Sequence, residues 1–181
     1  ERVVTNQFLS TVMDTNDEWI VERTGIHERR WIDPAKDTVA NMAAKATRMA
    51  LERAQLTPAD IDFIVFATIT PDYFFPGSGV LLQRELGIDG RIAALDIRNA
   101  CSGFIYALSI ADQFIKTGMY RNVLVVGAEI QSTALDITTR GRNTAVIFGD
   151  GAGAAILQAS ERQGILSTHL HSDGTFAEEL Y

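Results

Sequence analysis

The chain of 181 residues is long enough for one domain with a substantial hydrophobic core, and its 46% hydrophobic and 22% charged residues are ordinary for a globular protein. Its formal net charge of −7, from 23 acidic against 16 basic side chains, argues against nucleic acid as the main partner. No apolar run approaches the roughly 20 residues that cross a membrane, and a single cysteine forms no internal disulfide, so we expect a cytoplasmic protein without a membrane partner.

Two helices are predicted in the first part of the chain. Polar and acidic residues open a short helix over residues 14–25, and Gly25 ends it. Trp19 and Arg23 lie four residues apart on it and share a face. They are either a core tryptophan with a solvated arginine, or a flat aromatic beside a cation, which suits a nucleotide-bearing ligand. A longer helix is predicted over residues 38–54.

The middle of the chain predicts a strand, an aromatic loop and a helix. Residues 61–70 are apolar almost throughout, which indicates a strand in a sheet covered on both faces. The loop at residues 71–77 places aromatic residues between two prolines, and we expect it to close a pocket or to form an interface. A helix is predicted over residues 78–86, and Gly87 ends it.

The only cysteine, Cys101, lies where a predicted strand turns into a predicted helix. Apolar residues 92–97 indicate a buried strand, and residues 104–116 indicate a helix that ends at Gly118. Free backbone N–H groups and the positive end of the helix dipole favour a thiolate at such a turn. Cys101 is therefore either an activated nucleophile or, like many single cysteines, a small buried hydrophobe.

The last third of the chain continues the alternation of strands and helices. A buried strand is predicted over residues 122–130, and a polar connection follows it at residues 131–143. The alternating glycines of residues 149–153 lack the spacing of a phosphate loop, so we expect close backbone packing in a bent strand pair. His169 and His171 are predicted to share one side of a strand, and no metal site is predicted there. The alternation predicts an α/β layered fold with a largely parallel sheet.

Four stretches of the sequence together resemble one known family. They are residues 17–26 (DEWIVERTGI), 99–104 (NACSGF), 148–154 (FGDGAGA) and 167–174 (STHLHSDG). In this order, over nearly the whole chain, they resemble the β-ketoacyl-[acyl-carrier-protein] synthase III family of thiolase-fold condensing enzymes. The resemblance implies an α/β thiolase-like fold, layered α-β-α around a mixed, mostly parallel sheet. It also implies that residues 1–181 are the N-terminal half, which carries the nucleophile, and that the C-terminal half is absent from this chain.

The resemblance implies an acyltransferase of fatty acid or related biosynthesis that works in two half-reactions. Cys101 takes an acyl group from acyl-CoA as a thioester. Malonyl-acyl-carrier protein then binds and loses carbon dioxide, and the resulting carbanion attacks the acyl-enzyme. Acyl-CoA is thus a substrate, and no cofactor is implied. A histidine and an asparagine that stabilise the carbanion are expected in the C-terminal half, so we expect this chain alone to be unable to condense.

The resemblance also implies which residues bind the CoA moiety. Trp19 and Arg140 match positions that sandwich the adenine. Arg23 and Thr15 match positions along the binding tunnel. These residues would therefore hold the nucleotide end of the donor.

A second set of positions implied by the resemblance lines the acyl channel. Phe75 matches an aromatic that crosses the interface of a homodimer and closes the acyl pocket of the partner. Phe148 and Leu180 match positions in the channel wall. Two alternatives stay open: a thiolase-fold relative with a different acyl transfer, either a non-decarboxylative synthase or an acyltransferase, and a non-catalytic half-domain that assembles dimers.

Overall fold

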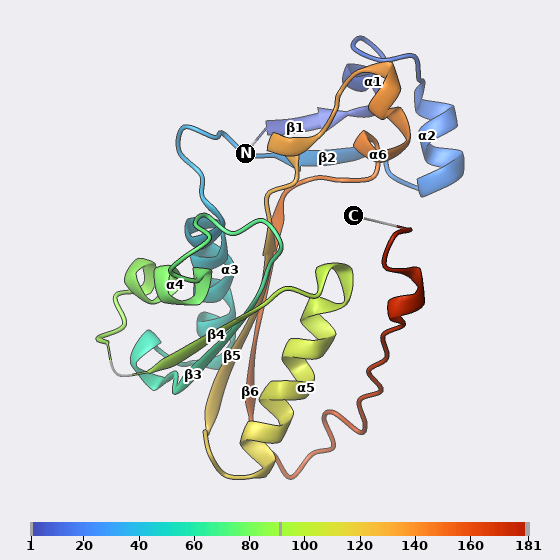
Figure 1. The fold of residues 1–181 in the computed structure, drawn as a ribbon. Coiled ribbons are helices and arrows are strands. Elements are labelled where there is room, and N and C mark those ends of the chain that lie inside the picture. Colours follow the sequence, from blue (N-terminus) through green and yellow to red (C-terminus); the bar gives the residue numbers. More distant parts are fainter. Residues whose placement is uncertain (1, 91, 180–181) are drawn as a thin grey trace.

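Two parts make up the fold that the computed structural model describes for residues 2–90 and 92–179 (Figure 1). The larger part is a β-sheet with helices on both faces. The smaller part, here called the cap, lies beyond one end of that sheet and has its own apolar core. The elements of the cap are β1 (Arg2–Thr5), α1 (Asn6–Leu9), α2 (Asp17–Thr24), β2 (Glu28–Trp31) and α6 (Arg142–Ala145).

Four strands form the sheet, in the order β4 (Ala93–Ile97), β3 (Phe63–Ala67), β5 (Asn122–Glu129) and β6 (Gly151–Gln158). β3 is parallel to both β4 and β5, whereas β6 is antiparallel to β5. The carboxyl ends of the three parallel strands and the beginning of β6 therefore meet at the same end of the sheet. The predicted mixed, mostly parallel sheet is confirmed.

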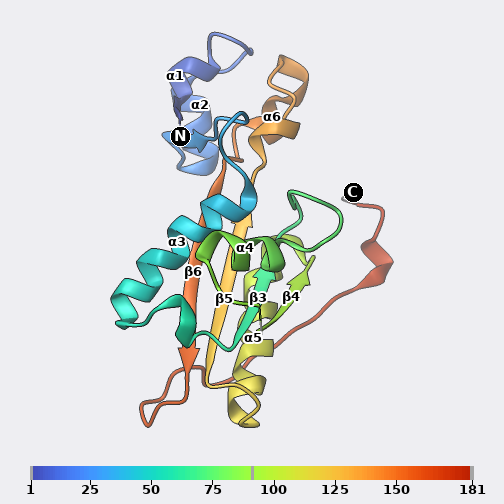
Figure 2. The same ribbon diagram turned by 90° about the vertical axis from the view of Figure 1, so that its left-hand side faces the viewer.

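Helices cover both faces of this sheet. α3 (Val39–Ala54) and α4 (Ser78–Leu86) pack on one face, and α5 (Gly103–Lys116) packs on the other (Figure 2). Because successive side chains of a strand point to opposite faces, β3 contributes Ile64 and Phe66 to the first layer and Phe63 and Val65 to the second. The layered α-β-α arrangement is thus confirmed. None of the described helices combines the length and the apolar composition needed to cross a bilayer.

Local signals in the sequence place the helix ends correctly. Gly25 and Gly87 follow α2 and α4 with left-handed backbones, at φ values of 70° and 68°. At the start of α3, the Thr38 hydroxyl accepts a hydrogen bond from the backbone N–H of Asn41. The carboxylate of Asp72 accepts two further bonds at this terminus, from the N–H groups of residues 39 and 40. The loop at residues 71–77 is therefore tied to α3.

Asp96 of β4 holds the start of α4. Its carboxylate accepts the backbone N–H groups of Ser78 at 2.5 Å and Gly79 at 2.9 Å, which also places a negative charge at the positive end of the helix dipole. The approach is so close that a Cβ on Gly77 would lie 2.7 Å from the Asp96 Cγ. Glycine at residue 77 is therefore required by packing.

The prediction of a buried strand before Cys101 is wrong in one respect. β4 forms at the expected place, but it pairs with β3 alone among the described residues and so lies at the edge of the sheet. Leu95 in its middle is 39% exposed. An apolar run predicts a strand, but the number of its neighbours depends on residues far away in the sequence.

The glycine-rich and histidine-bearing segments also differ from prediction. Close backbone packing occurs at Gly149, where a Cβ would lie 3.0 Å from the Arg29 Cβ, but Gly151 and Gly153 face open space. His169 and His171 lie in an irregular segment rather than on a strand. The backbone of this segment finds no strand partner in the described part of the chain and contacts α5 instead, where the Tyr106 hydroxyl donates to the His171 carbonyl. No cluster of three metal-ligating side chains occurs among the described residues.

Candidate active site

Cys101 is exposed and lies in a short 3-10 turn, Ala100–Ser102, between β4 and α5. The hydroxyl of Ser102 donates to the Asn99 carbonyl at 2.8 Å, which closes the turn. Ala100 has a left-handed backbone with a φ of 45°, a conformation that costs a non-glycine residue about 1–2 kcal/mol. Such strain at the residue before a cysteine is typical of a functional turn. The predicted strand-to-helix position is confirmed, and the alternative of a buried structural cysteine is wrong.

A cavity of about 330 Å³ opens beside Cys101. It lies at the end of the sheet where β3, β5 and β6 meet, and small residues dominate its wall. The lining residues are Ala67, Ala100, Cys101, Phe104, Gly127, Ala128, Glu129, Gly151, Ala152 and Gly153. Because nothing lies within 4 Å of a Cβ built on Gly151 or Gly153, the glycine-rich start of β6 leaves room next to the sulfur.

Glu129, at the end of β5, is the acidic residue in the wall of this cavity. Its carboxylate accepts bonds from the Thr70 hydroxyl at 2.6 Å and the Ile69 N–H at 2.9 Å, and lies 3.3 Å from the Thr68 hydroxyl. Because its oxygens already accept these hydrogen bonds, Glu129 holds the chain after β3 in place and is not the base that takes a proton from Cys101. The sequence analysis missed Glu129, although a carboxylate at the end of an apolar strand is a usable signal.

A second group of side chains lies on the cap. Two guanidinium groups lie close to the half-buried ring of Trp19: the Cζ of Arg23 lies 4.6 Å from the ring centroid, and the Cζ of Arg142 lies 4.7 Å from it. Arg142 is held in place because it donates to the Asp14 carbonyl at 2.7 Å. Trp19 also packs on the cap core, so it is partly a core residue and partly an aromatic surface beside cations. We call Trp19, Arg23 and Arg142 the cradle.

Arg142, rather than Arg140, is the arginine of this connection that lies against the Trp19 ring. The Arg140 side chain is 89% exposed, and its Nε lies 2.8 Å from a carboxylate oxygen of Asp136. A hydrogen bond from the Thr138 hydroxyl, together with that from Arg140, lowers the pKa of Asp136 to about 2. Sequence alone could not choose between two arginines separated by one residue, because the choice depends on how the connection folds.

The other predicted site residues are spread over the molecule. Thr15 is half-buried, and its hydroxyl oxygen is buried without a hydrogen-bond partner among the described residues. Phe148 is half-buried in the segment that enters β6, and Phe75 is 86% exposed in the loop before α4. Neither phenylalanine lines the cavity beside Cys101. Leu180 lies outside the described residues.

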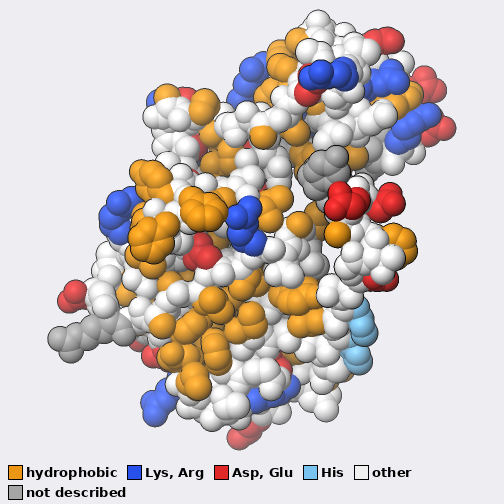
Figure 3. All heavy atoms as spheres, viewed as in Figure 1, with side chains coloured by type: hydrophobic (Ala, Val, Ile, Leu, Met, Phe, Trp, Pro, Cys, Tyr) orange, Lys and Arg blue, Asp and Glu red, His pale blue; other side chains and the backbone are white. Residues whose placement is uncertain are grey.

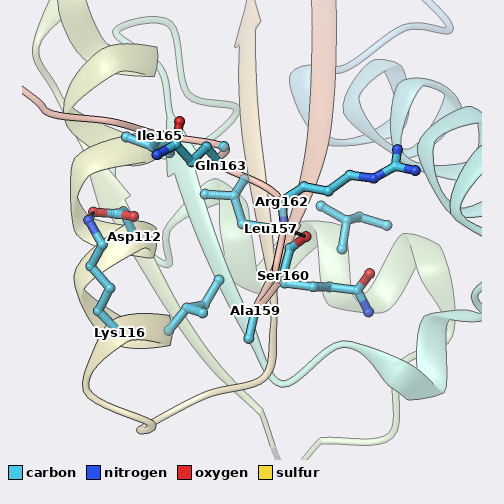
Figure 4. A pocket seen from close by; sticks show the side chains of 12 residues that line it. Asp112, Lys116, Leu157, Ala159, Ser160, Arg162, Gln163 and Ile165 are labelled. Atoms are coloured by element: carbon cyan, nitrogen blue, oxygen red, sulfur yellow. Dashed lines mark hydrogen bonds and ion pairs between the residues drawn. The ribbon is translucent and has the colours of Figure 1, made fainter.

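A larger cavity, of about 610 Å³, lies between the last turns of α5, the end of β6 and residues 159–165 (Figure 4). An ion pair of 2.7 Å between Asp112 and Lys116 stands on its α5 side. The first residue of α5 that lines this cavity, Asp112, is roughly 14 Å along the helix axis from Gly103 at the Cys101 end, at 1.5 Å per residue. The cavity is therefore separate from the site of the nucleophile.

Comparison with known proteins agrees with this geometry. Residues 95–174, which include Cys101, match the family model of 3-oxoacyl-[acyl-carrier-protein (ACP)] synthase III. The chain is 51% identical to the β-ketoacyl-[acyl-carrier-protein] synthase III of Thioalkalivibrio sulfidiphilus over 181 residues, which are 100% of this chain and 55% of that protein.

Solved structures give the same result. The 3-oxoacyl-[acyl-carrier-protein] synthase III of Aquifex aeolicus superposes with a TM-score of 0.91 at 47% identity, over 97% of this chain and 56% of that chain. The synthase III of Thermus thermophilus superposes with a TM-score of 0.92 at 41% identity, over 100% of this chain and 55% of that chain. The chain thus spans about half the length of these relatives, and over that length it belongs to the β-ketoacyl-[acyl-carrier-protein] synthase III family of thiolase-fold enzymes.

Proposed function

We propose that the full-length protein is a condensing enzyme of fatty acid or related biosynthesis that joins an acyl group from acyl-CoA to malonyl-acyl-carrier protein. The observation that carries this proposal is the exposed Cys101, on a strained turn at the head of α5 and beside a cavity of about 330 Å³. A thiol nucleophile must stay reduced, so we infer a cytoplasmic location. The membership of the chain in the synthase III family supports the same activity.

In the first half-reaction the thiolate of Cys101 forms a bond to the acyl carbonyl carbon of acyl-CoA. The bond from that carbon to the CoA sulfur then breaks, and CoA leaves as a thiolate with the electron pair. Negative charge develops on the carbonyl oxygen, and the backbone N–H of Cys101 at the start of the helix is suited to receive it. One such donor is typically worth about 3 kcal/mol of transition-state stabilisation.

In the second half-reaction malonyl-acyl-carrier protein replaces CoA. The bond to its terminal carboxylate breaks, carbon dioxide leaves, and the electron pair forms a carbanion that attacks the Cys101 thioester. Cys101 then leaves as a thiolate and the enzyme is regenerated. None of the three histidines of this chain lines the cavity beside Cys101. We therefore propose that the histidine and asparagine that stabilise the carbanion lie in the half of the protein that this chain does not span.

The cradle provides a surface for the nucleotide end of acyl-CoA. A planar adenine can stack against Trp19 and the guanidinium groups, whose positive charge also suits the CoA phosphates. We propose that Arg142 takes the role that the sequence analysis gave to Arg140. Thr15 is retained as a proposed contact, since its hydroxyl has no hydrogen-bond partner among the described residues.

The loop before α4 supports a homodimer. Tyr73, Phe74 and Phe75 are 58%, 92% and 86% exposed, and Leu95 of the neighbouring edge strand is 39% exposed. Figure 3 shows hydrophobic side chains gathered over this loop and over the face that β4 and α5 form. An exposed apolar patch of this kind is typical of a protein interface. We propose that a second copy covers it, with Phe75 reaching the acyl pocket of its partner.

The experiment that tests the function is acylation of Cys101 followed by condensation. The full-length protein is incubated with acetyl-CoA, and peptide mass spectrometry should locate one acetyl group on Cys101. Addition of malonyl-acyl-carrier protein should then release carbon dioxide and remove the acetyl group. A Cys101→Ala variant is the control and should carry no acetyl group. Absence of an adduct in the wild-type protein would refute the proposal, and an adduct without carbon dioxide release would indicate a non-decarboxylating acyl transfer.

A further inference from the structure

The segment at residues 146–150 joins the cap to the sheet. Arg29 of β2 is buried, and its guanidinium donates to the Val146 carbonyl at 3.0 Å. The backbone N–H of Asp150 donates to the Arg30 carbonyl at 2.8 Å. Gly149 lies against the same strand, so closely that a Cβ there would be 3.0 Å from the Arg29 Cβ and would force a small shift. We call this contact the junction.

The carboxylate of Asp150 is the centre of the junction. One of its oxygens accepts the backbone N–H groups of Gln131 and Ser132, both at 2.8 Å. The other accepts the backbone N–H of Ile32 at 2.7 Å and the Ser132 hydroxyl at 2.5 Å. Asp150 thus ties together the chain after β2 in the cap, the chain after β5 and the start of β6. Hydrogen bonds of this length to a charged acceptor are among the stronger ones in proteins.

The position of the junction connects the two halves of the proposed site. β6 starts directly after Asp150, and its first three residues, Gly151–Gly153, line the cavity beside Cys101. β2, on the other side of the junction, belongs to the cap, which carries Trp19. The place of the cradle relative to the sulfur therefore depends on the bonds across the junction, of which the bond from Ile32 is the one that the Asp150 carboxylate supplies.

We propose that Asp150 is a positioning residue that fixes the distance between the cradle and Cys101. Acylation of Cys101 by donors that carry the CoA nucleotide then requires Asp150, whereas acylation by donors without the nucleotide does not. This inference rests on the proposed function, because it needs a donor that reaches both sites. Asp150 itself touches no reacting atom in this assignment. It acts through the backbone of residues 32, 131 and 132.

The Asp150→Asn variant perturbs this distance selectively. An asparagine can still accept the N–H groups of residues 131 and 132 through its carbonyl oxygen. Its amide nitrogen can donate to the Ser132 hydroxyl, but it cannot accept from the Ile32 N–H, which then faces another donor. The variant should therefore loosen the junction, which keeps only the bonds between Arg29 and Val146 and between the backbones of residues 150 and 30, while the bonds to the chain after β5 remain. Ser132→Ala is the matched control, because it removes one donor to Asp150 without touching the bond from Ile32.

The test measures the second-order rate constant for acetylation of Cys101 in the full-length protein, with acetyl-CoA and with acetyl-pantetheine, which lacks the nucleotide. We expect Asp150→Asn to lower the constant at least tenfold for acetyl-CoA and less than twofold for acetyl-pantetheine. Ser132→Ala should change both by less than twofold. Equal losses with both donors, or no loss, would overturn the inference, because Asp150 would then only support the cavity.

Two further outcomes distinguish a failure of this inference from a failure of the proposed function. If the wild-type protein is acetylated by neither donor, the proposed function fails before any variant is compared. If Asp150→Asn does not fold, Gly149→Ala replaces it, since the added Cβ would lie 3.0 Å from the Arg29 Cβ and 3.1 Å from the Arg30 carbonyl oxygen and would push β2 away. If Gly149→Ala lowers the acetylation rate constant at least threefold for acetyl-CoA and not for acetyl-pantetheine, the inference is supported, and any other result overturns it.

Discussion

Replacement of Arg142 by alanine should weaken binding of acyl-CoA, whereas the same change at Arg140 should not. The Arg142 Cζ lies 4.7 Å from the Trp19 ring centroid, so an adenine that stacks in the cradle can make a cation–π contact of its own with this guanidinium. Such a contact contributes about 0.5–1 kcal/mol at an exposed site, and ligand desolvation brings it to about 2 kcal/mol. Because 1.4 kcal/mol corresponds to a factor of ten, we expect KM for acetyl-CoA to rise about 2- to 30-fold in Arg142→Ala.

The assay compares initial rates over a range of acetyl-CoA and of acetyl-pantetheine concentrations. Arg142→Ala should raise KM for acetyl-CoA with little change in kcat, and it should leave acetyl-pantetheine unaffected. Arg140→Ala is the matched control, since its side chain is 89% exposed and pairs with Asp136. A loss in Arg140→Ala as large as that in Arg142→Ala would refute the assignment of the nucleotide to the cradle.

Three more predictions concern stability and the cavity. Asp96→Ala removes both acceptors at the start of α4 and should lower the free energy of unfolding by about 1–2 kcal/mol, measured by urea denaturation; no loss would mean that the helix needs no carboxylate there. Gly151→Val should slow acylation of Cys101 without lowering the thermal midpoint, because a Cβ at residue 151 meets nothing within 4 Å and points to cavity space; an unchanged rate would contradict the cavity. The pKa of Asp136 is about 2 in the folded protein, below its ordinary value of 3.8. The wild type should therefore be more stable than Asp136→Asn above pH 3.8, and this difference should disappear as the pH falls through 2. A difference in the free energy of unfolding that does not change with pH would contradict this.

The features that the sequence predicts well are those set by local chemistry. Gly25 and Gly87 end their helices because glycine adopts the left-handed backbone without a steric cost. The turn that carries Cys101 follows from an apolar run next to a helix with small residues at its start. These signals lie within a few residues of the structure they specify, so a single sequence is enough to find them.

The features that the sequence does not predict depend on distant neighbours. Arg142 reaches the Trp19 ring from a connection that is tightly folded at Gly141, where a Cβ would overlap the backbone of Asp136. Nothing in the order of residues 131–143 reveals that turn. Likewise, the four donors to Asp150 come from two segments that are distant from it in the sequence, at residue 32 and at residues 131–132, so its part in the junction can be seen only in the folded chain.

The open side of β6 has a practical consequence for work with residues 1–181 on their own. β6 pairs only with β5 in the described part of the chain, and its sequence, GAGAAILQ, contains no charge and no proline. A strand of this composition offers a template on which another copy can add by backbone hydrogen bonds. Purified alone, this polypeptide should therefore self-associate through β6, and a lysine introduced along that strand should keep it dispersed.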